Sequence, residues 1–402
     1  MKGEILKDKR ILLGITGSIA AYKILLLIRD LRKAGAEVKV VMTPSAVEFI
    51  TPLSVSTLSN NEVFHRISDG ESWSNHVELG LWADIFVIAP CTANTLASMC
   101  TGRCDNMLLA CYLSARCPVM AAPAMDLDMW AHPTTKRNIF QLEKDGVEII
   151  NVGYGELASG LTGNGRMAEP EKILRNIVVS LAHKQATFSG KKVLVTAGPT
   201  YESIDPVRFI GNWSSGRMGV SIAEAFFLHG AEVHLIAGPV QHFPEYEDIK
   251  VHSVVSAKEM YDKAVELWPE MDVGILAAAV ADYTPGQYFE EKVKKKGGEW
   301  SIQLDRTKDI AHQLGKAKIN NQILVGFALE TSDEIKNAKS KLKKKNFDWI
   351  VLNSLNDQGA GFGHLTNKVT FLHANGKKEL FDLKSKNEVA LDIVMETEKR
   401  LQ

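Results

Sequence analysis

Three turns in the first half of the chain carry hydroxyl or amide side chains, and each follows a run of apolar residues. Their sequences are GITGSIAAYK (14–23), MTPSA (42–46) and APCTANT (89–95). Ligands of open α/β sheets bind where strands end and helices begin, and the free N–H groups of a helix start suit a phosphate. The candidate contacts in these turns are Gly17, Ser18, Thr43, Ser45, Ala89, Thr92 and Asn94.

Two interpretations of these turns are open. None of them contains GxGxxG, so the dinucleotide fingerprint fails and a mononucleotide remains. Ordinary turns and helix caps use the same residue types. Three such turns at neighbouring strand ends favour a phosphate-bearing ligand over three unrelated caps.

Other segments of the first half carry groups that can do chemistry. NHVELGLWAD (75–84) holds His76, and APAMDLDMW (122–130) holds Met125 and Asp126. A single helical His is more often structural, a Met is usually core, and an Asp at this position can cap a helix. ELASGLTGNGRM (156–167) has three glycines and no apolar periodicity, so it is either a linker or a flap over a ligand.

The second half has its own candidate turns. GNWSSGRM within 197–219 has the GxxxxG spacing of a P-loop, but the Lys-Ser/Thr pair is missing, which excludes a Walker motif. The small residues of AAAVADY (277–283) let a flat ligand approach the backbone. Lys341 and Lys345 stand one helical turn apart and can reach one phosphate group. The basic run EEKVKKKGG (290–298) is, on composition alone, a solvated loop.

The apolar pattern predicts two α/β domains, each with a parallel sheet of the flavodoxin-like or Rossmann type covered on both faces. Expected strands are 10–16, 37–43, 84–90 and 118–124 in the first half, and 192–198, 232–238, 273–281, 323–329 and 349–353 in the second. Expected helices include 18–35, 215–230, 257–268 and 332–346. The polar stretch 183–192 interrupts this pattern, so we expect domains over 1–183 and 191–402 with a linker at 184–190.

Composition excludes several classes of protein. The 402 residues carry 47 Lys and Arg against 48 Asp and Glu, without the basic excess of a nucleic-acid binder. The N-terminus has no long apolar run, so we expect a cytoplasmic protein with no membrane partner. All five cysteines fall between Cys91 and Cys117, which favours reduced thiols. Cys100 and Cys104 are expected on one helix face, where buried small hydrophobes are favoured over a metal site.

Together these segments resemble one family over nearly the whole chain. The matching motifs are TGSIAAYK, NHVELGLWAD, PAMDLDMW and GNGRM in the first half, and AGPTYESIDPVR, NWSSGRMG, AAVADY, EKVKK, GFALET and KLKKK in the second. The family is the bifunctional enzyme of coenzyme A synthesis, which fuses phosphopantothenoylcysteine decarboxylase to phosphopantothenate–cysteine ligase. The first half is also similar to the wider flavin-containing cysteine decarboxylases.

For the first half, the resemblance implies FMN with its phosphate near Gly17, Ser18, Thr43 and Ser45. The flavin takes electrons from the substrate cysteine, carbon dioxide leaves, and the electrons return to give 4′-phosphopantetheine. His76 matches the catalytic His, which handles the first proton or orients the substrate. GLTGNGRM matches a flap that closes over the substrate, and the implied substrate contacts are Met125, Gly163, Gly165, Arg166 and Met167.

For the second half, the resemblance implies a ligase. CTP activates 4′-phosphopantothenate as an acyl-cytidylate, Mg²⁺ neutralises the triphosphate, and the amine of cysteine displaces CMP. Asn212 matches the residue linked to use of the acyl intermediate, and Lys292 matches the catalytic Lys, which reverses the interpretation of the basic run. The implied nucleotide contacts are Ala278, Asp282, Lys308, Asp309, Ile310, Phe327, Lys341 and Lys345. The resemblance assigns no metal ligands, and it implies a homo-oligomer with flavin-domain trimers, ligase-domain dimers and a dodecamer.

Two positions depart from the family pattern. Asp126 stands where the family has an Asn that helps to hold the substrate carboxylate, so Asp126 is either protonated or contacts the substrate differently. Ser159 stands where the family has a Cys that protonates the product, and a hydroxyl is a poorer acid than a thiol. Three outcomes are open: Ser159, Asp126 or water supplies the proton; the reaction stalls at the oxidised enethiol; or the flavin half is only an FMN-binding scaffold.

A different enzyme class shares the architecture of the first half, namely the flavin prenyltransferases. The ligase-like second half and the His76 motif argue against that class. We therefore expect both a decarboxylase and a ligase, with Ser159 and Asp126 among the catalytic candidates.

Overall fold

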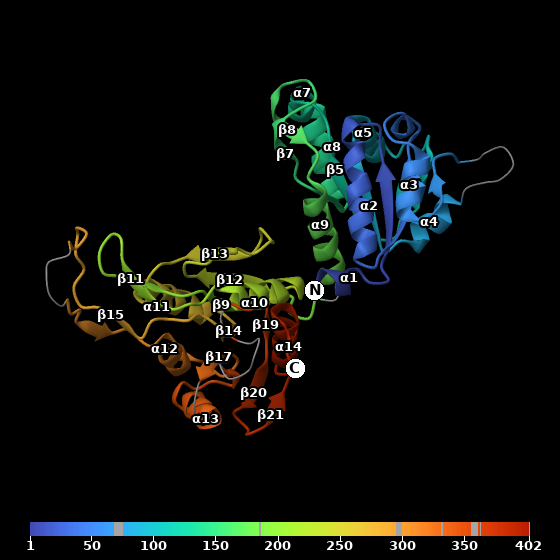
Figure 1. Ribbon diagram of the computed structural model, residues 1–402. Helices are drawn as coiled ribbons and strands as arrows, with labels where there is room; N and C mark the ends of the chain where they lie inside the picture. Colours follow the sequence, from blue (N-terminus) through green and yellow to red (C-terminus); the bar gives the residue numbers. More distant parts are fainter. Residues whose placement is uncertain are drawn as a thin grey trace. The chain divides into compact units, whose positions relative to one another are not determined.

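The computed structural model describes residues 1–67, 75–184, 186–294, 300–330, 333–354, 361 and 363–401. The chain divides into two compact units, Met1–Lys184 and Gln185–Gln402 (Figure 1). Each unit has a central sheet with helices packed on it, so the expected α/β class is confirmed. The part of the basic run at 295–298 lies outside the described residues.

The first unit is built on a six-stranded parallel sheet in the order β3-β2-β1-β4-β5-β6. This is the strand order of a Rossmann-type sheet, with β1 and β4 on either side of the switch point. The strands are β1 (Arg10–Ile15), β2 (Glu37–Met42), β3 (Val63–Phe64), β4 (Ile85–Cys91), β5 (Val119–Pro123) and β6 (Val147–Ile149). The sequence predicted four of them; β3 and β6 are too short to show a pattern.

Helices cover both faces of this sheet. The helix predicted over 18–35 is a 3₁₀ segment, η1 (Ile19–Lys23), followed by α2 (Ile24–Lys33). Ser18 caps the 3₁₀ segment by accepting a hydrogen bond from the Ala20 N–H at 3.2 Å. The other helical segments are α1 (Lys2–Leu6), η2 (Pro44–Glu48), α3 (Pro52–Ser59), α4 (His76–Trp82), α5 (Ala93–Thr101), α6 (Met107–Ser114), α7 (Leu127–Ala131), α8 (Pro133–Lys144) and α9 (Pro170–His183).

The expectation that Cys100 and Cys104 share a helix face is wrong. Helix α5 ends at Thr101 because Gly102 adopts a left-handed conformation, with φ of 68°, so Cys104 lies beyond the helix. Cys91 and Cys111 are buried in the apolar core beside the sheet. Burial raises the pKa of the Cys111 thiol to about 12, as expected for a small hydrophobic residue.

The second unit has an eight-stranded sheet in the order β13-β12-β9-β14-β17-β18-β20-β21, parallel except for its last two strands. The strands are β9 (Lys192–Ala197), β12 (Glu232–Ala237), β13 (Lys250–Ser253), β14 (Val273–Leu276), β17 (Ile323–Glu330), β18 (Trp349–Ser354), β20 (Val369–His373) and β21 (Lys378–Leu380). Strand β14 ends five residues before the predicted end at 281, although Ala279 still bridges Pro199 in the register of β14 and β9, and its N–H donates to the Gly198 carbonyl at 2.8 Å.

The remaining elements of the second unit are helices against the sheet and short hairpins. The helices are α10 (Arg217–Leu228), α11 (Ala257–Leu267), η3 (Trp268–Glu270), α12 (Ile310–Ala317), α13 (Glu334–Lys344) and α14 (Lys386–Glu398). The hairpins pair β10 (Tyr201–Ser203) with β11 (Phe209–Gly211), β15 (Tyr283–Pro285) with β16 (Leu304–Arg306), and β19 (Thr366–Asn367) with β22 (Lys384–Ser385). No helix among the described residues has the length and apolar character to cross a membrane.

A buried threonine joins the first strand of each sheet to the loop after a neighbouring strand. In the first unit the Thr16 hydroxyl donates to the Pro90 carbonyl at 2.7 Å and accepts from the Thr92 N–H at 3.2 Å. In the second unit the Thr196 hydroxyl accepts from the Ala278 N–H at 3.2 Å. Both threonines are almost fully buried. Each therefore fixes the carboxyl-end turns on the two sides of a switch point.

We expect Thr16→Val and Thr196→Val to weaken only the unit that carries each change. Valine keeps the shape of threonine but leaves buried backbone groups without a partner, which costs about 1–3 kcal/mol. Hydrogen exchange of the full chain, read by mass spectrometry, should show faster exchange at β1 and β4 for the first variant and at β9 and β14 for the second. Each variant is the control for the other, and equal protection in both would contradict this account of the switch points.

Candidate functional site

A pocket of about 520 Å³ lies at the carboxyl ends of the first sheet. The turns after β1, β2 and β4 line it together with the segment after β5. It brings together six of the cofactor candidates: Gly17, Ser18, Thr43, Ser45, Thr92 and Asn94. Ala89 is buried inside β4 and does not line the pocket. Asp105 and Asn106 also line it and were missed, since no pattern in the sequence links that loop to the three turns.

The turns of this pocket approach each other closely enough to form a cradle. A Cβ atom on Gly17 would lie 2.7 Å from the Ser45 Cβ, so only glycine permits this approach. The Thr43 hydroxyl is buried and has no hydrogen-bond partner among the residues that the structure describes. A buried hydroxyl without a partner is costly unless a ligand engages it. These residues therefore fit a phosphate-bearing ligand.

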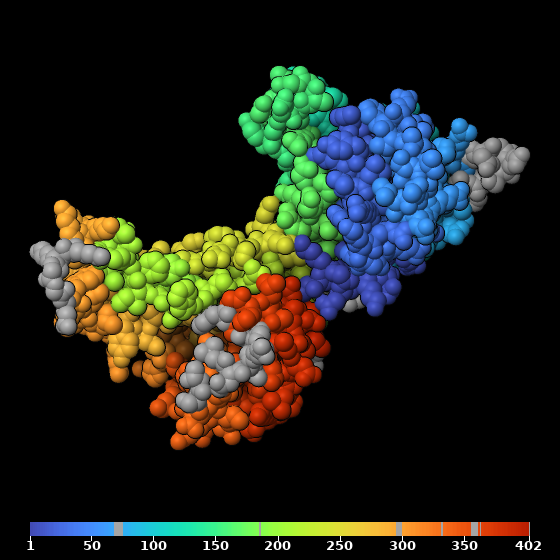
Figure 2. Space-filling model, viewed as in Figure 1, coloured from blue at the N-terminus to red at the C-terminus, as the bar shows by residue number. Residues whose placement is uncertain are grey.

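A second pocket of about 500 Å³ adjoins the first and shares Ser18, Ala124 and Met125 with it. Its wall is the segment 156–167, which forms a hairpin of β7 (Gly153–Glu156) and β8 (Thr162–Arg166). Figure 2 shows this hairpin (green) at the surface of the first unit. Segment 156–167 is thus a flap over a pocket and not a linker.

Glycines let the flap dock on the backbone after β5. The Met125 N–H donates to the Gly165 carbonyl at 3.0 Å. Gly165 has φ of 136°, and a Cβ atom there would lie 2.4 Å from the Met125 carbonyl oxygen. A Cβ atom on Gly163 would meet the Leu127 side chain at 2.5 Å. Met125, Gly165, Arg166 and Met167 line the pocket, whereas Gly163 supports it from behind.

The two departing positions contact each other inside this second pocket. The Ser159 hydroxyl donates to Asp126 Oδ1 at 3.0 Å, and the Leu127 N–H donates to the same oxygen at 2.6 Å. Lys23 and Arg166 also line the pocket, and both pair with Glu169, at 2.7 and 3.2 Å. The Lys23 hydrogen bond and the charges of both cations lower the pKa of Glu169.

His76 is the exception among the candidates of the first unit. It is the first residue of α4, where Asn75 caps the helix by accepting from the Glu78 N–H at 3.0 Å. His76 lines neither of the two pockets that the described residues of this unit form at the flavin cradle and the flap. Within the described part of the chain, His76 therefore does not share a pocket with Ser159 and Asp126.

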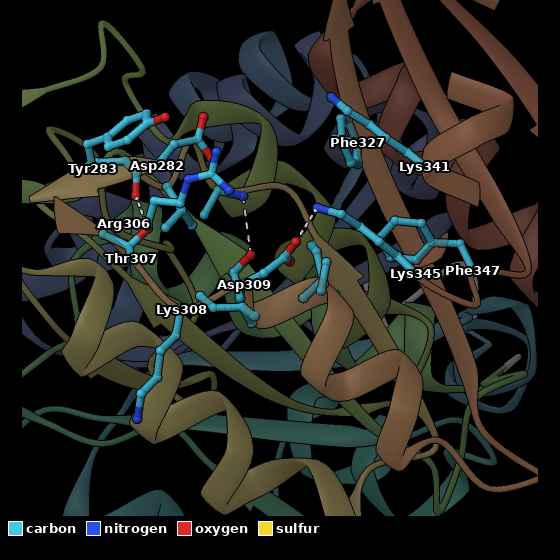
Figure 3. Close-up of a pocket in the computed structure, with 17 residues that line it drawn as sticks. Asp282, Tyr283, Arg306, Thr307, Lys308, Asp309, Phe327, Lys341, Lys345 and Phe347 are labelled. Atoms are coloured by element: carbon cyan, nitrogen blue, oxygen red, sulfur yellow. Dashed lines mark hydrogen bonds and ion pairs between the residues drawn. The ribbon is translucent and has the colours of Figure 1, made fainter. Parts of the chain in front are cut away.

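The second unit has a pocket of about 490 Å³ at the carboxyl ends of β14 and β17 (Figure 3). It brings together every nucleotide-contact candidate of the second half: Ala278, Asp282, Lys308, Asp309, Ile310, Phe327, Lys341 and Lys345. Thr196, Arg306 and Thr307 also line it and were missed. The TKDI sequence around Lys308 was a signal for Thr307, whose hydroxyl donates to the Ala281 carbonyl at 2.7 Å.

Two of the four cations of this pocket have carboxylate partners. Lys341 pairs with Glu330 at 2.7 Å, and Lys345 pairs with Asp309 at 3.1 Å. Burial alone would raise the pKa of Asp309, but the His312 N–H and Lys345 outweigh it and lower that pKa. Figure 3 shows Lys341 and Lys345 on the same side as Phe327, whereas the Lys308 side chain points away from them. Lys308 lies over the Tyr261 ring, 4.9 Å from its centre.

The two catalytic candidates of the second half lie outside this pocket. The Asn212 amide donates to the Ala279 carbonyl at 2.9 Å, which places it at the same edge of the sheet. Lys292 is exposed on a loop whose neighbour Val293 is held by the 205–208 turn. In that turn, hydrogen bonds from Arg208 and three backbone N–H groups outweigh burial and lower the pKa of Asp205.

A smaller pocket of about 150 Å³ shares Ala278 and Phe327 with the large one. Ser214, Ser215 and Gly216, which lie at the start of α10, line it. So does Lys386, which is 7% exposed and whose pKa is lowered by burial. No pattern in the sequence pointed to Lys386, which comes from the start of α14.

One group of possible metal ligands occurs among the described residues: His373, Glu379 and Glu396, whose ligand atoms lie within 4.8 Å of one another. Lys377 pairs with Glu379, and Lys399 and Arg400 pair with Glu396. Burial and the Arg400 charge lower the pKa of His373. These cations occupy the place of a metal ion, and the group is an ion-pair network away from both pockets.

Comparisons with known proteins cover both halves. Residues 2–182 match the Flavoprotein family, and residues 188–401 match the DNA/pantothenate metabolism flavoprotein C-terminal domain (DFP). The chain is 55% identical over 350 residues to a Cysteine/Cysteine sulfinic acid decarboxylase from an unknown prokaryotic organism, covering 86% of this chain and 98% of that protein. It is 42% identical over 395 residues to the Coenzyme A biosynthesis bifunctional protein CoaBC of Bacillus subtilis (strain 168), covering 98% and 97%.

Another CoaBC, from Haemophilus influenzae, is 42% identical over 399 residues and covers 99% of both chains. Among solved structures, the C-terminal domain of a CoaBC is 38% identical and has a TM-score of 0.46, covering 54% of this chain and 98% of its own. The FMN-dependent cysteine decarboxylase SpaF is 32% identical with a TM-score of 0.38, covering 44% and 97%. The chain belongs to the family of bifunctional coenzyme A biosynthesis enzymes, in which a flavoprotein decarboxylase half precedes a DFP ligase half.

Proposed function

We propose that the ligase half joins 4′-phosphopantothenate to cysteine with CTP, and that the flavin half decarboxylates the product to 4′-phosphopantetheine. The observation that supports this proposal is that most of the expected binding residues of each half line pockets at the carboxyl ends of its sheet. The full-length relatives named as bifunctional support two active halves. The alternative of a flavin half that serves only as a scaffold is not favoured.

In the flavin half, the residues of the cradle would hold the phosphate of FMN. The free Thr43 hydroxyl and the turn at Gly17 supply the donors. Bound FMN would supply a two-electron acceptor and donor next to the substrate sulfur. The flap would exclude water, and Ser159 would place its hydroxyl at the substrate through its hydrogen bond to Asp126.

His76 would complete this site from a second copy of the chain. The described pockets of one chain do not include it, although its motif belongs to the decarboxylase half. A homo-oligomer in which flavin halves meet at the pocket would bring in the imidazole. There it would accept or hold the first proton.

The first test gives the full chain, with FMN bound, synthetic 4′-phosphopantothenoylcysteine without CTP. We expect catalytic conversion to 4′-phosphopantetheine in a mass-spectrometric time course. Replacement of His76 by Asn should lower this turnover about 100-fold or more, the usual size of a proton-transfer contribution. CMP release by the same sample should be unchanged. A stoichiometric product two hydrogens lighter would mean that Ser159 does not complete the reaction, and no product would contradict the decarboxylase.

The glycine of the cradle gives an independent test of FMN binding. The Cβ atom of Gly17→Ala would press on Ser45 and separate the two turns. We expect FMN affinity to fall about tenfold or more, the consequence of overpacking at a tight contact. Quenching of FMN fluorescence measures it, and Gly3→Ala is the matched control because nothing lies within 4 Å of its new methyl group. Equal FMN affinity of the two variants would show that Gly17 does not belong to the phosphate site.

In the ligase half, the large pocket would bind CTP. Phe327 and the small residues after β14 leave room for a flat ring, and Lys341 and Lys345 would turn from their carboxylate partners to phosphate oxygens. Mg²⁺ would arrive with the triphosphate, since it keeps several waters and needs few protein carboxylates. Asp282 and Asp309 are the carboxylates that the pocket offers to it. Asn212 and Lys292 would act on the acyl intermediate from the adjoining loops.

Replacement of one of these lysines by a neutral residue should lower kcat/KM for CTP. We expect Lys345→Gln to lower kcat/KM for CTP about 10- to 100-fold, the effect of losing one charge-assisted contact. Lys343→Gln is the matched control, since Lys343 is exposed on the same helix and does not line the pocket. CMP release with 4′-phosphopantothenate, cysteine and magnesium measures both. Similar kcat/KM values for CTP in the two variants would show that the triphosphate does not bind at Lys345.

A second candidate function concerns the flavin half alone. The relative that is 55% identical is named for decarboxylation of cysteine and cysteine sulfinic acid. Free cysteine has the same thiol and carboxylate as the cysteine end of 4′-phosphopantothenoylcysteine, so the same cradle and flap would serve it. The charge of Asp126 in the pocket favours this candidate.

A further inference from the structure

Asp126 lines the flap pocket, and two donors hold its carboxylate. Its side-chain hydrogen bonds, from the Leu127 N–H at 2.6 Å and the Ser159 hydroxyl at 3.0 Å, both reach Oδ1. Among the described residues, no hydrogen bond or ion pair engages Oδ2. The backbone and the flap thus hold the carboxylate through one oxygen, and the second oxygen keeps its acceptor capacity for a ligand.

The charges around this oxygen decide what kind of ligand it takes. Lys23 and Arg166 line the same pocket, but Glu169 pairs with both of them. Glu156 adds another carboxylate to the lining. Three carboxylates thus stand against two cations. A ligand carboxylate at Asp126 would be repelled, whereas a ligand ammonium there would balance the charge and donate to Oδ2.

The position of Asp126 relative to the flavin cradle limits the size of that ligand. Met125, the residue before it, lines both the cradle and the flap pocket. A small ligand bound at Asp126 therefore lies beside the pocket proposed for FMN. An α-amino group, one carbon away from both the carboxylate and the side chain of an amino acid, meets this requirement.

We propose that Asp126, held by Ser159, recognises the protonated α-amino group of a small sulfur amino acid in the flavin half. The inference rests on the proposed decarboxylase and adds a substrate class, namely free amino thiols of the cysteine type. In 4′-phosphopantothenoylcysteine the same nitrogen is a neutral amide, which carries no charge to offset the carboxylate. Asp126 is thus a residue that sets substrate specificity.

Two unreactive probes isolate the recognition step from the chemistry. S-methylcysteine has the ammonium group, and 3-(methylthio)propionate has the same skeleton without it. We would titrate each into the FMN-loaded full chain and follow the flavin absorbance. We expect the native chain to bind S-methylcysteine about tenfold or more tighter, the effect of one charge-assisted contact. In Asp126→Asn, which preserves the shape of the side chain, the two affinities should agree within about threefold.

Asp128→Asn is the matched control, because Asp128 is exposed on the same helix and does not line the pocket. It should keep the native preference. Ser159→Ala keeps the carboxylate but loosens it, and should reduce the preference without abolishing it. Equal affinity of the native chain for the two probes overturns the proposal whatever the variants do. So does a preference that survives in Asp126→Asn.

Turnover separates this proposal from the proposed function. Release of carbon dioxide would be measured from free cysteine and from 4′-phosphopantothenoylcysteine with the same preparations. An ammonium preference that depends on Asp126, without turnover of either substrate, upholds the recognition and contradicts the decarboxylase. Turnover of 4′-phosphopantothenoylcysteine by a chain that binds both probes equally upholds the decarboxylase and contradicts the recognition.

Discussion

The two buried hydroxyls of Thr16 and Thr196 set the geometry on which both pockets depend. At a switch point the connections from two adjacent parallel strands leave on opposite faces of the sheet, which opens a crevice between the turns. Thr16 ties the end of β1 to the loop after β4, and Thr196 ties β9 to the loop after β14. The crevice cannot widen without breaking these buried hydrogen bonds. Because the same kind of threonine hydrogen bond occurs in both units, their pockets lie at equivalent positions of the two sheets although the proposed ligands differ.

Close approach of backbone to backbone determines which residue types surround the crevices. A Cβ atom on Gly238 would lie 1.9 Å from the Pro199 carbonyl oxygen, and one on Gly165 would lie 2.4 Å from that of Met125. With no room for side chains there, the groups that face a ligand are backbone N–H groups and short hydroxyls such as that of Thr43. Charged residues are displaced to the rim, where helix α13 and the flap carry them.

Sequence patterns predicted the features that depend on residues close together in the chain. They missed the features that depend on contacts between residues far apart in the chain. Buried parallel strands are continuous apolar runs, so most of the sheet was predictable, and the pockets followed from the turns at the strand ends. The early end of β14 was not predictable, because the Ala278 N–H donates to the side chain of Thr196, which is far away in sequence. Lys386 was not predictable either, because it comes from the last helix and meets the other residues of its pocket only in the folded chain. The contact between Ser159 and Asp126 also needed the folded flap, although both residues were already singled out by type.

The sign of the unbalanced charge distinguishes the two pockets more than their size, since both are close to 500 Å³. In the ligase pocket, four cations stand against three carboxylates, with Glu330 and Asp309 holding Lys341 and Lys345 ready. An anionic ligand can replace these carboxylate partners at little cost in free energy, because each lysine exchanges a carboxylate oxygen for a ligand oxygen. The carboxylate that is released can then face a divalent cation. In the flap pocket, Glu169 pairs with both cations. The charge that is left there without a partner is therefore the charge of a carboxylate. The charge left over after pairing thus differs in sign between the two pockets: it is positive in the ligase pocket, which suits the proposed polyphosphate, and negative in the flap pocket, which suits the proposed ammonium group.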